Sequence, residues 1–313
     1  MAERELVEYI RQLAAGERPP WLEVGIGDDA AVLRVPDDSR VVVTTDSVIE
    51  SVHFKAGTEP ELVGRKAVAR CLSDIAAMAA RPLCTVAAVG FGRSYDDVAC
   101  RRLCKALYEA ARELSAPLVG GDVASGPGPT TVTVTALGTA GSAGVVTRSG
   151  ARPGDAICVT GRLGGSIRGR HLTFRPRIPE ALALAGRCRL HAMIDISDGL
   201  STDALHIAEE SAVGVVLRAA DIPVSDDAVV LSRATGRPPL WHALNDGEDY
   251  ELLFCLGVAD ARELARSGVA GAAGERVGVS IIGEVVAGAA SYLEAADGSR
   301  EPLTAGGWEH LTR

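Results

Sequence analysis

Hydrophobic residues recur along the chain in two rhythms, one typical of helices and the other of strands. In residues 61–80 and 97–114 the apolar positions are three and four apart, which predicts two long helices. Shorter runs rich in β-branched and other apolar residues predict strands. We expect strands over residues 41–46, 84–89, 118–122, 130–137, 156–160, 192–196, 213–218, 251–256 and 279–286, and further helices over residues 3–15, 201–212 and 260–267.

The order of these elements predicts a two-domain α/β (α+β) protein. In the first half, a strand–helix–strand unit followed by helix–strand–strand is typical of a split βαβ, ferredoxin-like arrangement. Glycine becomes frequent between residues 138 and 156, and such a change in composition indicates a domain boundary. We therefore expect an N-terminal domain over residues 1–147 and an α/β C-terminal domain over residues 148–313.

Composition excludes several classes of protein. The chain has 313 residues, of which 47% are apolar, and this is enough for a large core. A net charge of -9 argues against a broad nucleic-acid surface, and seven cysteines without a Cys-x-x-Cys pair argue against a disulfide framework or structural zinc. Neither a signal peptide nor an apolar run long enough to span a membrane is evident. We expect a cytoplasmic protein that binds neither nucleic acid nor membrane.

Aspartates at the ends of predicted strands are the first candidates for chemistry. Asp46, Asp122 and Asp195 each end, or nearly end, an apolar strand. Because ligands of open α/β sheets gather at the carboxyl ends of strands, these three side chains could meet.

Three further aspartates would complete a ring of carboxylates. Asp29 follows a glycine turn, Asp74 interrupts the apolar stripe of a helix, and Asp198 precedes another helix. Six carboxylates in a small volume repel one another unless cations neutralise them, and oxygen ligands select hard ions such as Mg²⁺. Such a site suits polyphosphate binding and phosphoryl transfer. The alternatives are a plain surface turn at Asp29 and a local cap or ion pair at Asp74.

Phosphates would have to be held without a P-loop, because the chain has no Gly-x-x-x-x-Gly-Lys-[Ser/Thr] motif. Gly120 and Gly121 would let the backbone approach a phosphate closely. The helix start at residues 197–199 supplies free N–H groups and the positive end of a helix dipole. Arg148 is a candidate phosphate clamp, and its alternative role is a solvated charge.

Three other residues have weaker signals. His53 is either a functional or a structural histidine. Trp308 could stack on a flat cationic or aromatic ligand, or could simply pack. Glu248 and Asp249 lie in an acidic turn, which is solvated in the alternative interpretation.

In their order and spacing, these segments resemble the thiamine-monophosphate kinase family, within the wider group of aminoimidazole ribonucleotide synthetase, selenophosphate synthetase and a hydrogenase maturation protein. The resemblance spans nearly the whole chain. It rests on GIGDDAAVL (residues 25–33), TTD (44–46), HF (53–54), LSDIAAM (72–78), GGD (120–122), RSGA (148–151), IDISDGL (194–200) and GEDYEL (247–252).

The resemblance implies an ATP-dependent kinase that converts thiamine monophosphate to thiamine diphosphate by direct in-line attack of the substrate phosphate on the γ-phosphorus. It implies several Mg²⁺ ions, an N-terminal domain that binds ATP and Mg²⁺, and a homodimer whose N-terminal strands join across the interface. Two alternatives stay open: another ATP-using relative with a different small-molecule acceptor, and a non-catalytic nucleotide- or metal-binding homodimer.

The resemblance also implies roles for individual residues, with no catalytic residue beyond the metal ligands. The implied Mg²⁺ ligands, some through backbone or water, are Asp29, Thr44, Thr45, Asp46, Asp74, Asp122, Asp195 and Asp198. The implied ATP contacts are Gly121, Asp122, Arg148 and Ser197. The implied substrate contacts are His53, Glu248 and Trp308, with Trp308 stacking on a thiamine ring.

The chain departs from the family pattern at several positions. Cys71 replaces an Asn, Ala79 replaces a Gly, and Cys104 stands where an aromatic residue usually lies near the adenine. The stretch over residues 161–177 is shorter than the family's, which predicts a missing or reduced helix there.

Overall fold

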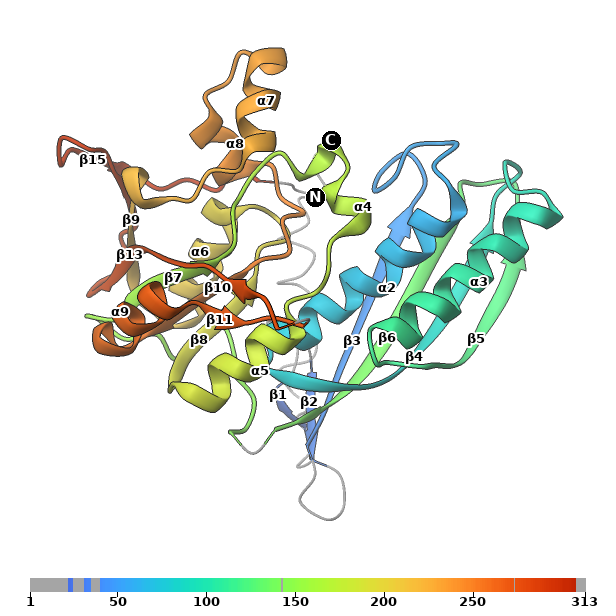
Figure 1. Cartoon of the computed structure of the whole chain (residues 1–313), viewed down its shortest axis with the longest axis horizontal. Helices are drawn as coiled ribbons and strands as arrows, with labels where there is room; N and C mark the ends of the chain where they lie inside the picture. The colour runs from blue at the N-terminus through green and yellow to red at the C-terminus, as the bar shows by residue number, and fades with distance from the viewer. Residues whose placement is uncertain (1–21, 25–30, 35–39, 142, 273, 308–313) are drawn as a thin grey trace.

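Two large sheets flanked by helices make up the protein (Figure 1). The computed structural model describes residues 22–24, 31–34, 40–141, 143–272 and 274–307. The predicted helix over residues 3–15 lies outside these ranges, as do Asp29 and Trp308. The first sheet is built from residues 22–140 and the second from residues 156–302. The predicted domain boundary between residues 147 and 148 falls between the two sheets and stays a prediction.

In the described part of the chain, the first sheet has six strands and two covering helices. Its strand order is β1 (Leu22–Val24), β2 (Ala31–Arg34), β3 (Arg40–Ile49), β6 (Thr131–Ala140), β4 (Ala80–Phe91) and β5 (Leu118–Ser125), with helices α2 (Pro60–Ala77) and α3 (Asp97–Glu113). Strands β3 and β4 each run antiparallel to β6, so they are parallel to each other with β6 between them. The predicted split βαβ unit is therefore confirmed.

The two faces of this sheet differ in polarity. In β6, Val132 and Val134 are buried, whereas Thr133 and Thr135 on the opposite face are partly exposed. Helices α2 and α3 lie on the valine face (Figure 1). In the part of the chain that the structure describes, no helix covers the threonine face.

Helix α2 lies between the two halves of the protein and contacts both. Its Gly64 lets α3 approach closely, since a Cβ at this position would come within 2.7 Å of Ala106 Cβ. On its other sides α2 packs against β3 and β6 and against α4 (Arg170–Thr173), α5 (Ile178–Arg187) and β8 (Leu190–Asp195) of the second half. This position explains why most of the helix is buried.

The second sheet has seven strands and is largely antiparallel. Its order is β15 (Arg300–Pro302), β14 (Tyr292–Glu294), β9 (Gly214–Arg218), β13 (Val279–Val286), β7 (Ala156–Thr160), β10 (Leu252–Leu256) and β8. The remaining elements are η2 (Ser166–Arg168), α6 (Leu200–Glu210), η3 (Ala219–Asp221), α7 (Asp226–Thr235), α8 (Pro239–Asn245), α9 (Val258–Ser267) and the small β11 (Val269–Ala270) and β12 (Arg276–Val277) pair. Strands β7 and β10 are buried throughout, as their continuous apolar sequences predict.

The structure corrects two of the three predicted strand ends. Asp195 does end β8, but Asp46 and Asp122 lie inside β3 and β5. The strands continue past these residues because backbone pairing does not depend on an apolar side chain. Residues 161–177 contain only η2 and the four-residue α4 as regular structure. No helix among the described residues is long and apolar enough to cross a membrane.

Candidate active site

Four polar side chains lie along one side of α2, and together they contact segments from both halves of the protein. They are Lys66, Arg70, Ser73 and Asp74, whose spacing of four, three and one residues places them on one face of the helix. We call this set the polar stripe of α2. Glu61 and Arg65 of the same helix pair with residues of α3, and the rest of the helix is largely apolar and buried.

Two members of the polar stripe contact β3. Thr44 Oγ1 donates a hydrogen bond of 2.6 Å to Asp74 Oδ2. The guanidinium of Arg70 forms an ion pair with Asp46 through Nε and Oδ2. Three residues implied as metal ligands, Thr44, Asp46 and Asp74, are therefore close together on the helix-facing side of the first sheet.

Ser73 connects the stripe to the second half of the protein. Its Oγ donates a hydrogen bond of 2.5 Å to Asp195 Oδ2 at the end of β8. Both side chains are almost fully buried. Asp195 thus joins Asp46 and Asp74 around α2, although it belongs to the other sheet. The helix brings these aspartates near one another, and not, as predicted, a shared edge of one sheet.

Lys66 is completely buried and holds the opposite end of the stripe. Its Nζ lies 2.5 Å from Glu248 Oε1, 2.6 Å from the carbonyl oxygen of His53 and 2.9 Å from His171 Nδ1. Glu248 and the His53 carbonyl accept two of the ammonium N–H groups, and His171 Nδ1 accepts the third in the tautomer that carries its proton on Nε2. His171 Nδ1 also lies 3.2 Å from Glu248 Oε2. Lys66 therefore fixes two residues implied as substrate contacts, His53 and Glu248, relative to each other.

This cluster keeps Glu248 ionised. Burial raises the pKa of Glu248, but the neighbouring His171 imidazole and the charge of Lys66 outweigh burial and lower the pKa to about 2. Burial also lowers the pKa of Lys66, while the Glu248 carboxylate opposes that shift.

Glu248 belongs to a turn with unusual backbone geometry. Glu248 and Tyr250 have φ values of 53° and 52°, in the left-handed region that non-glycine residues seldom adopt. Backbone hydrogen bonds from Glu248 N to Ser197 O (2.7 Å) and from Tyr250 N to Ile196 O (2.8 Å) hold the turn beside the end of β8. Tyr250 also stacks on Phe174 with ring centroids 3.9 Å apart. Such strain is maintained where the surroundings fix it, and often at functional sites.

A cavity of about 260 Å³ lies beside this turn, between the two halves. Its lining comprises Val52, His53, Arg70, Ser166, Ile167, Ser197, Asp198, Asp246, Gly247, Glu248 and Tyr250. The backbone N–H of Ile49 donates to His53 Nδ1 over 3.1 Å, so a neutral His53 ring carries its proton on Nε2. Of the residues predicted from sequence, His53, Ser197, Asp198 and Glu248 all line this cavity.

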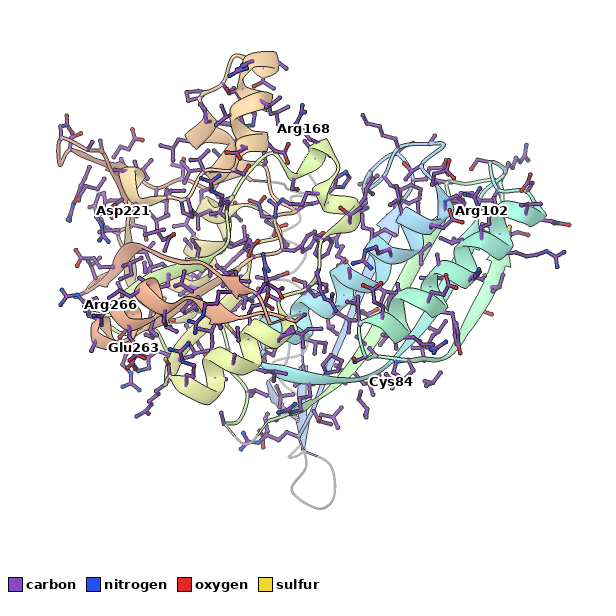
Figure 2. The ribbon with its side chains drawn as sticks, viewed as in Figure 1. Cys84, Arg102, Arg168, Asp221, Glu263 and Arg266 are labelled. Atoms are coloured by element: carbon purple, nitrogen blue, oxygen red, sulfur yellow. The ribbon has the colours of Figure 1, made fainter. Side chains whose placement is uncertain are left out.

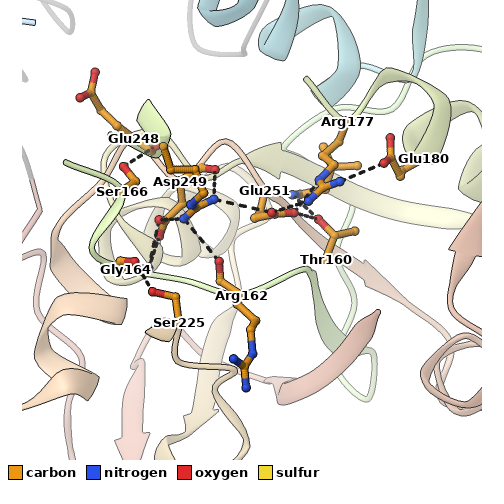
Figure 3. A network of polar contacts seen from close by, with 12 residues as sticks. Thr160, Arg162, Gly164, Ser166, Arg177, Glu180, Ser225, Glu248, Asp249 and Glu251 are labelled. Atoms are coloured by element: carbon orange, nitrogen blue, oxygen red, sulfur yellow. Dashed lines mark hydrogen bonds and ion pairs between the residues drawn. The ribbon is translucent and has the colours of Figure 1, made fainter. Parts of the chain in front are cut away.

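Behind the turn, a buried polar network supports it (Figure 3). Asp249 accepts hydrogen bonds from Gly164 N (2.8 Å) and from the Arg170 guanidinium (2.5 Å). Burial raises the pKa of Asp249 to about 7, although Arg170 and Gly164 oppose the shift. Glu251 accepts two hydrogen bonds from Arg177, at 2.6 and 2.7 Å. The solvated-turn interpretation of residues 248–249 is therefore wrong, because both side chains are bound and Asp249 is buried.

Other predicted residues do not reach the cavity within one chain. In the sheet register, Asp46, Val134, Ala87 and Gly121 form one row, so Gly121 is three strands, or about 14 Å, away from Asp46. Asp122 and Thr45 belong to neighbouring rows, whose side chains lie on the open threonine face. Asp122 therefore does not meet Asp46 in one chain, contrary to the strand-end expectation.

The helix start at residues 197–199 also differs from expectation. Asp203, in the first turn of α6, accepts hydrogen bonds from the backbone N–H groups of Asp198 (3.2 Å) and Gly199 (3.1 Å). These two groups are therefore not free to bind phosphate. Arg148 lies near the other end of α6, where its carbonyl oxygen accepts a hydrogen bond from Ser211.

The donor atoms around α2 fit a hard cation. Thr44, Asp46, Asp74 and Asp195 offer only oxygen atoms, the ligands that Mg²⁺ prefers. Among the described residues, the potential ligand atoms of Asp198, Asp203 and His206 also lie close together, within 4.8 Å of one another. We regard the oxygen-only set as the better match for Mg²⁺, since the second set includes an imidazole.

Sequence reasoning missed Lys66, Arg70, Ser73 and His171 as parts of the site. Lys66 and Arg70 had a detectable signal, because charged residues on an apolar helix are the same exception that identified Asp74. Ser73 and His171 had no such signal, because serine is common in helices and a single histidine does not form a spaced motif with other residues.

Comparison with known proteins defines the class to which this fold and site belong. The family described as "AIR synthase related protein, N-terminal domain" matches residues 27–140, and "AIR synthase related protein, C-terminal domain" matches residues 136–295. The two-domain α/β architecture is therefore that of the AIR synthase related proteins.

Individual relatives are more specific. Thiamine-monophosphate kinase of Rhodopirellula baltica is 36% identical over 268 residues (83% of each chain), and that of Escherichia coli K12 is 33% identical over 313 residues (93% of this chain and 92% of the relative). The solved structure described as AaThiL complexed with AMPPCP and TMP has a TM-score of 0.84 and 25% identity, covering 99% of this chain and 97% of that one. Thiamine-monophosphate kinase from Stenotrophomonas maltophilia has a TM-score of 0.71 and 28% identity, covering 96% and 99%. The chain belongs to the thiamine-monophosphate kinase family.

Proposed function

We propose that the protein transfers the γ-phosphoryl group of ATP to thiamine monophosphate and forms thiamine diphosphate. The observation that carries the proposal is that α2 gathers carboxylates from both halves, Asp46 and Asp74 from the first and Asp195 from the second, and that Arg70 of the same stripe lines the cavity, in a chain of this family. Oxygen of the acceptor phosphate would attack the γ-phosphorus as the bond to the bridging oxygen of ADP breaks. Because this phosphate is already ionised near neutral pH, the step needs no general base.

Magnesium would be held by the oxygen ligands around α2. Thr44, Asp46, Asp74 and Asp195 are the residues we assign to it in the described part of the chain. Bound Mg²⁺ supplies charge neutralisation for the transferring phosphoryl group. Asp29 stays a proposed ligand on the resemblance alone.

The acceptor would occupy the cavity beside the turn over residues 246–250. His53 and Glu248 reach it from the two halves of the chain, and Lys66 holds both. A carboxylate whose pKa is lowered to about 2 stays charged at neutral pH and attracts the cationic thiazolium ring. Trp308 stays a proposed stacking residue.

We also propose that the protein is a homodimer and that the partner completes the ATP site. Gly121 and Asp122 lie on β5, an exposed strand at the edge of the first sheet. The open threonine face is the surface that we propose packs against another copy of the chain. Within one chain, Asp122 does not reach the other implied metal ligands that the structure describes. A second subunit placed on the threonine face would bring its own Asp122 toward ligands of the first subunit, including Thr45. Arg148 and Ser197 are the remaining proposed ATP contacts.

An assay with purified protein, ATP, Mg²⁺ and thiamine monophosphate tests the proposed reaction. We expect thiamine diphosphate and ADP in equal amounts, with no product when Mg²⁺ is omitted. ATP turnover only with a different acceptor would assign the chain to another activity of the wider group. Binding of ATP without any turnover would support the non-catalytic alternative. We place the reaction in the cytoplasm, where ATP is supplied.

A further inference from the structure

A phosphate group in the cavity needs a positive charge that the residues implied by the resemblance do not provide. Among the described lining residues, Asp198, Asp246 and Glu248 are acidic, and Arg70 is the one lysine or arginine. Carboxylates that line the same cavity repel a phosphate dianion, so a positive charge beside the phosphate must compensate its charge. Arg70 is in the right place to do so.

One edge of the Arg70 guanidinium is paired with Asp46, and the opposite edge is available to a ligand. Its Nε forms the ion pair with Asp46, whose second carboxylate oxygen accepts a hydrogen bond of 2.8 Å from Ser47 N. The terminal guanidinium nitrogens make no hydrogen bond or ion pair to any residue that the structure describes, while the side chain is 16% exposed and lines the cavity. A planar guanidinium anchored in this way has paired donors in the geometry that a phosphate accepts.

We propose that the terminal nitrogens of Arg70 bind the phosphate of the acceptor, while Asp46 holds the Nε edge of the guanidinium. This proposal rests on the function proposed above. The acceptor phosphate then lies between the turn over residues 246–250 and the oxygen ligands of β3 and α2. This is the side of the cavity from which its oxygen can meet a nucleotide held by the metal ligands. Arg70 therefore distinguishes thiamine monophosphate from unphosphorylated thiamine.

The test compares the dissociation constants of thiamine monophosphate and thiamine by isothermal titration calorimetry. It uses the full chain with Mg²⁺ present and nucleotide absent. We expect the parent to prefer the phosphorylated ligand. In Arg70→Met this preference should fall by about tenfold or more, the usual effect of losing a hydrogen bond between charged groups, while the affinity for thiamine stays the same. Arg70→Lys keeps a cation beside Asp46 but loses the paired donors, so we expect an intermediate preference.

Arg102→Met is the matched control. Arg102 lies on α3 (Figure 2), where it pairs with Glu59 and Glu61 at the start of α2 and does not line the cavity, so its loss should leave the preference unchanged. An unchanged preference in Arg70→Met, or equal weakening of both ligands in Arg70→Met and Arg70→Lys, would overturn the assignment. Because binding is measured without turnover, a parent that binds thiamine monophosphate through Arg70 but transfers no phosphoryl group refutes only the proposed reaction.

Discussion

Replacing Lys66 with methionine should destabilise the protein strongly, because the change removes one charge from a buried cluster and leaves the other behind. Lys66 is fully buried, and its ammonium has three partners within 2.9 Å. Methionine fills a similar volume but donates no hydrogen bond. Glu248, which keeps 23% of its side chain exposed, would retain its charge without its nearest cation.

The magnitude follows from the pKa of Glu248. A shift from the ordinary 4.5 to about 2 corresponds to about 3 kcal/mol in favour of the carboxylate. His171 shares that stabilisation, so only part of it depends on Lys66. Adding the lost hydrogen bond to the His53 carbonyl, we expect the free energy of unfolding to fall by about 2–4 kcal/mol, in the range seen when one partner of a buried ion pair is removed.

Urea unfolding of four proteins measures this effect: the parent, Lys66→Met, Glu248→Gln and the double variant. We expect the double variant to lose less stability than the sum of the two single changes, because no unpaired charge remains. Lys105→Met, at an exposed position on α3, controls for loss of a lysine and should change stability little. Parental stability of Lys66→Met, or additive losses in the double variant, would refute the role given to this cluster.

Four further predictions concern catalysis, assembly and pH. Asp74→Asn should reduce turnover by at least about tenfold, with its thermal unfolding unchanged because Thr44 can still donate to the amide oxygen; parental turnover would remove Asp74 from the metal site. Ala88→Arg, on the open threonine face, should give a monomer by light scattering, whereas a dimer would place the interface elsewhere. Since the folded pKa of Glu248 is lowered from 4.5 to about 2, its stabilising contribution is full above pH 4.5 and is lost as the pH falls toward 2. The stability difference between the parent and Glu248→Gln should therefore narrow over this range, and a constant difference would contradict the shift. Trp308→Ala should raise the KM for thiamine monophosphate more than the KM for ATP in steady-state kinetics, and equal increases would argue against stacking.

Local periodicity was sufficient to predict most of the elements that carry the site. Helix α2 was expected over residues 61–80 and spans Pro60–Ala77, and the predicted bounds of β7 and β13 agree with the structure. Asp74 was identified because a carboxylate on an apolar helix face needs a partner. The small elements α7, α8, β14 and β15 were missed, since they are short and have few buried residues to set a period.

The arrangement of the site was harder to predict than its members. The apolar run stops at Asp46 and predicts a strand end there, yet the backbone of β3 continues to pair with β6 as far as Ile49. The contacts of Lys66 with Glu248 and of Ser73 with Asp195 join distant parts of the chain, and periodicity contains no information about such pairs. Only the packing of α2 between the two halves determines them.

The polar stripe of α2 makes the enzyme sensitive to the length of this helix as well as to its composition. One residue inserted between Lys66 and Arg70 would rotate everything after it by about 100° about the helix axis. Arg70, Ser73 and Asp74 would then turn away from their partners, although none of these side chains had been altered. We expect related chains to vary in length within the loops around α2, and to keep a constant number of residues from Lys66 to Asp74.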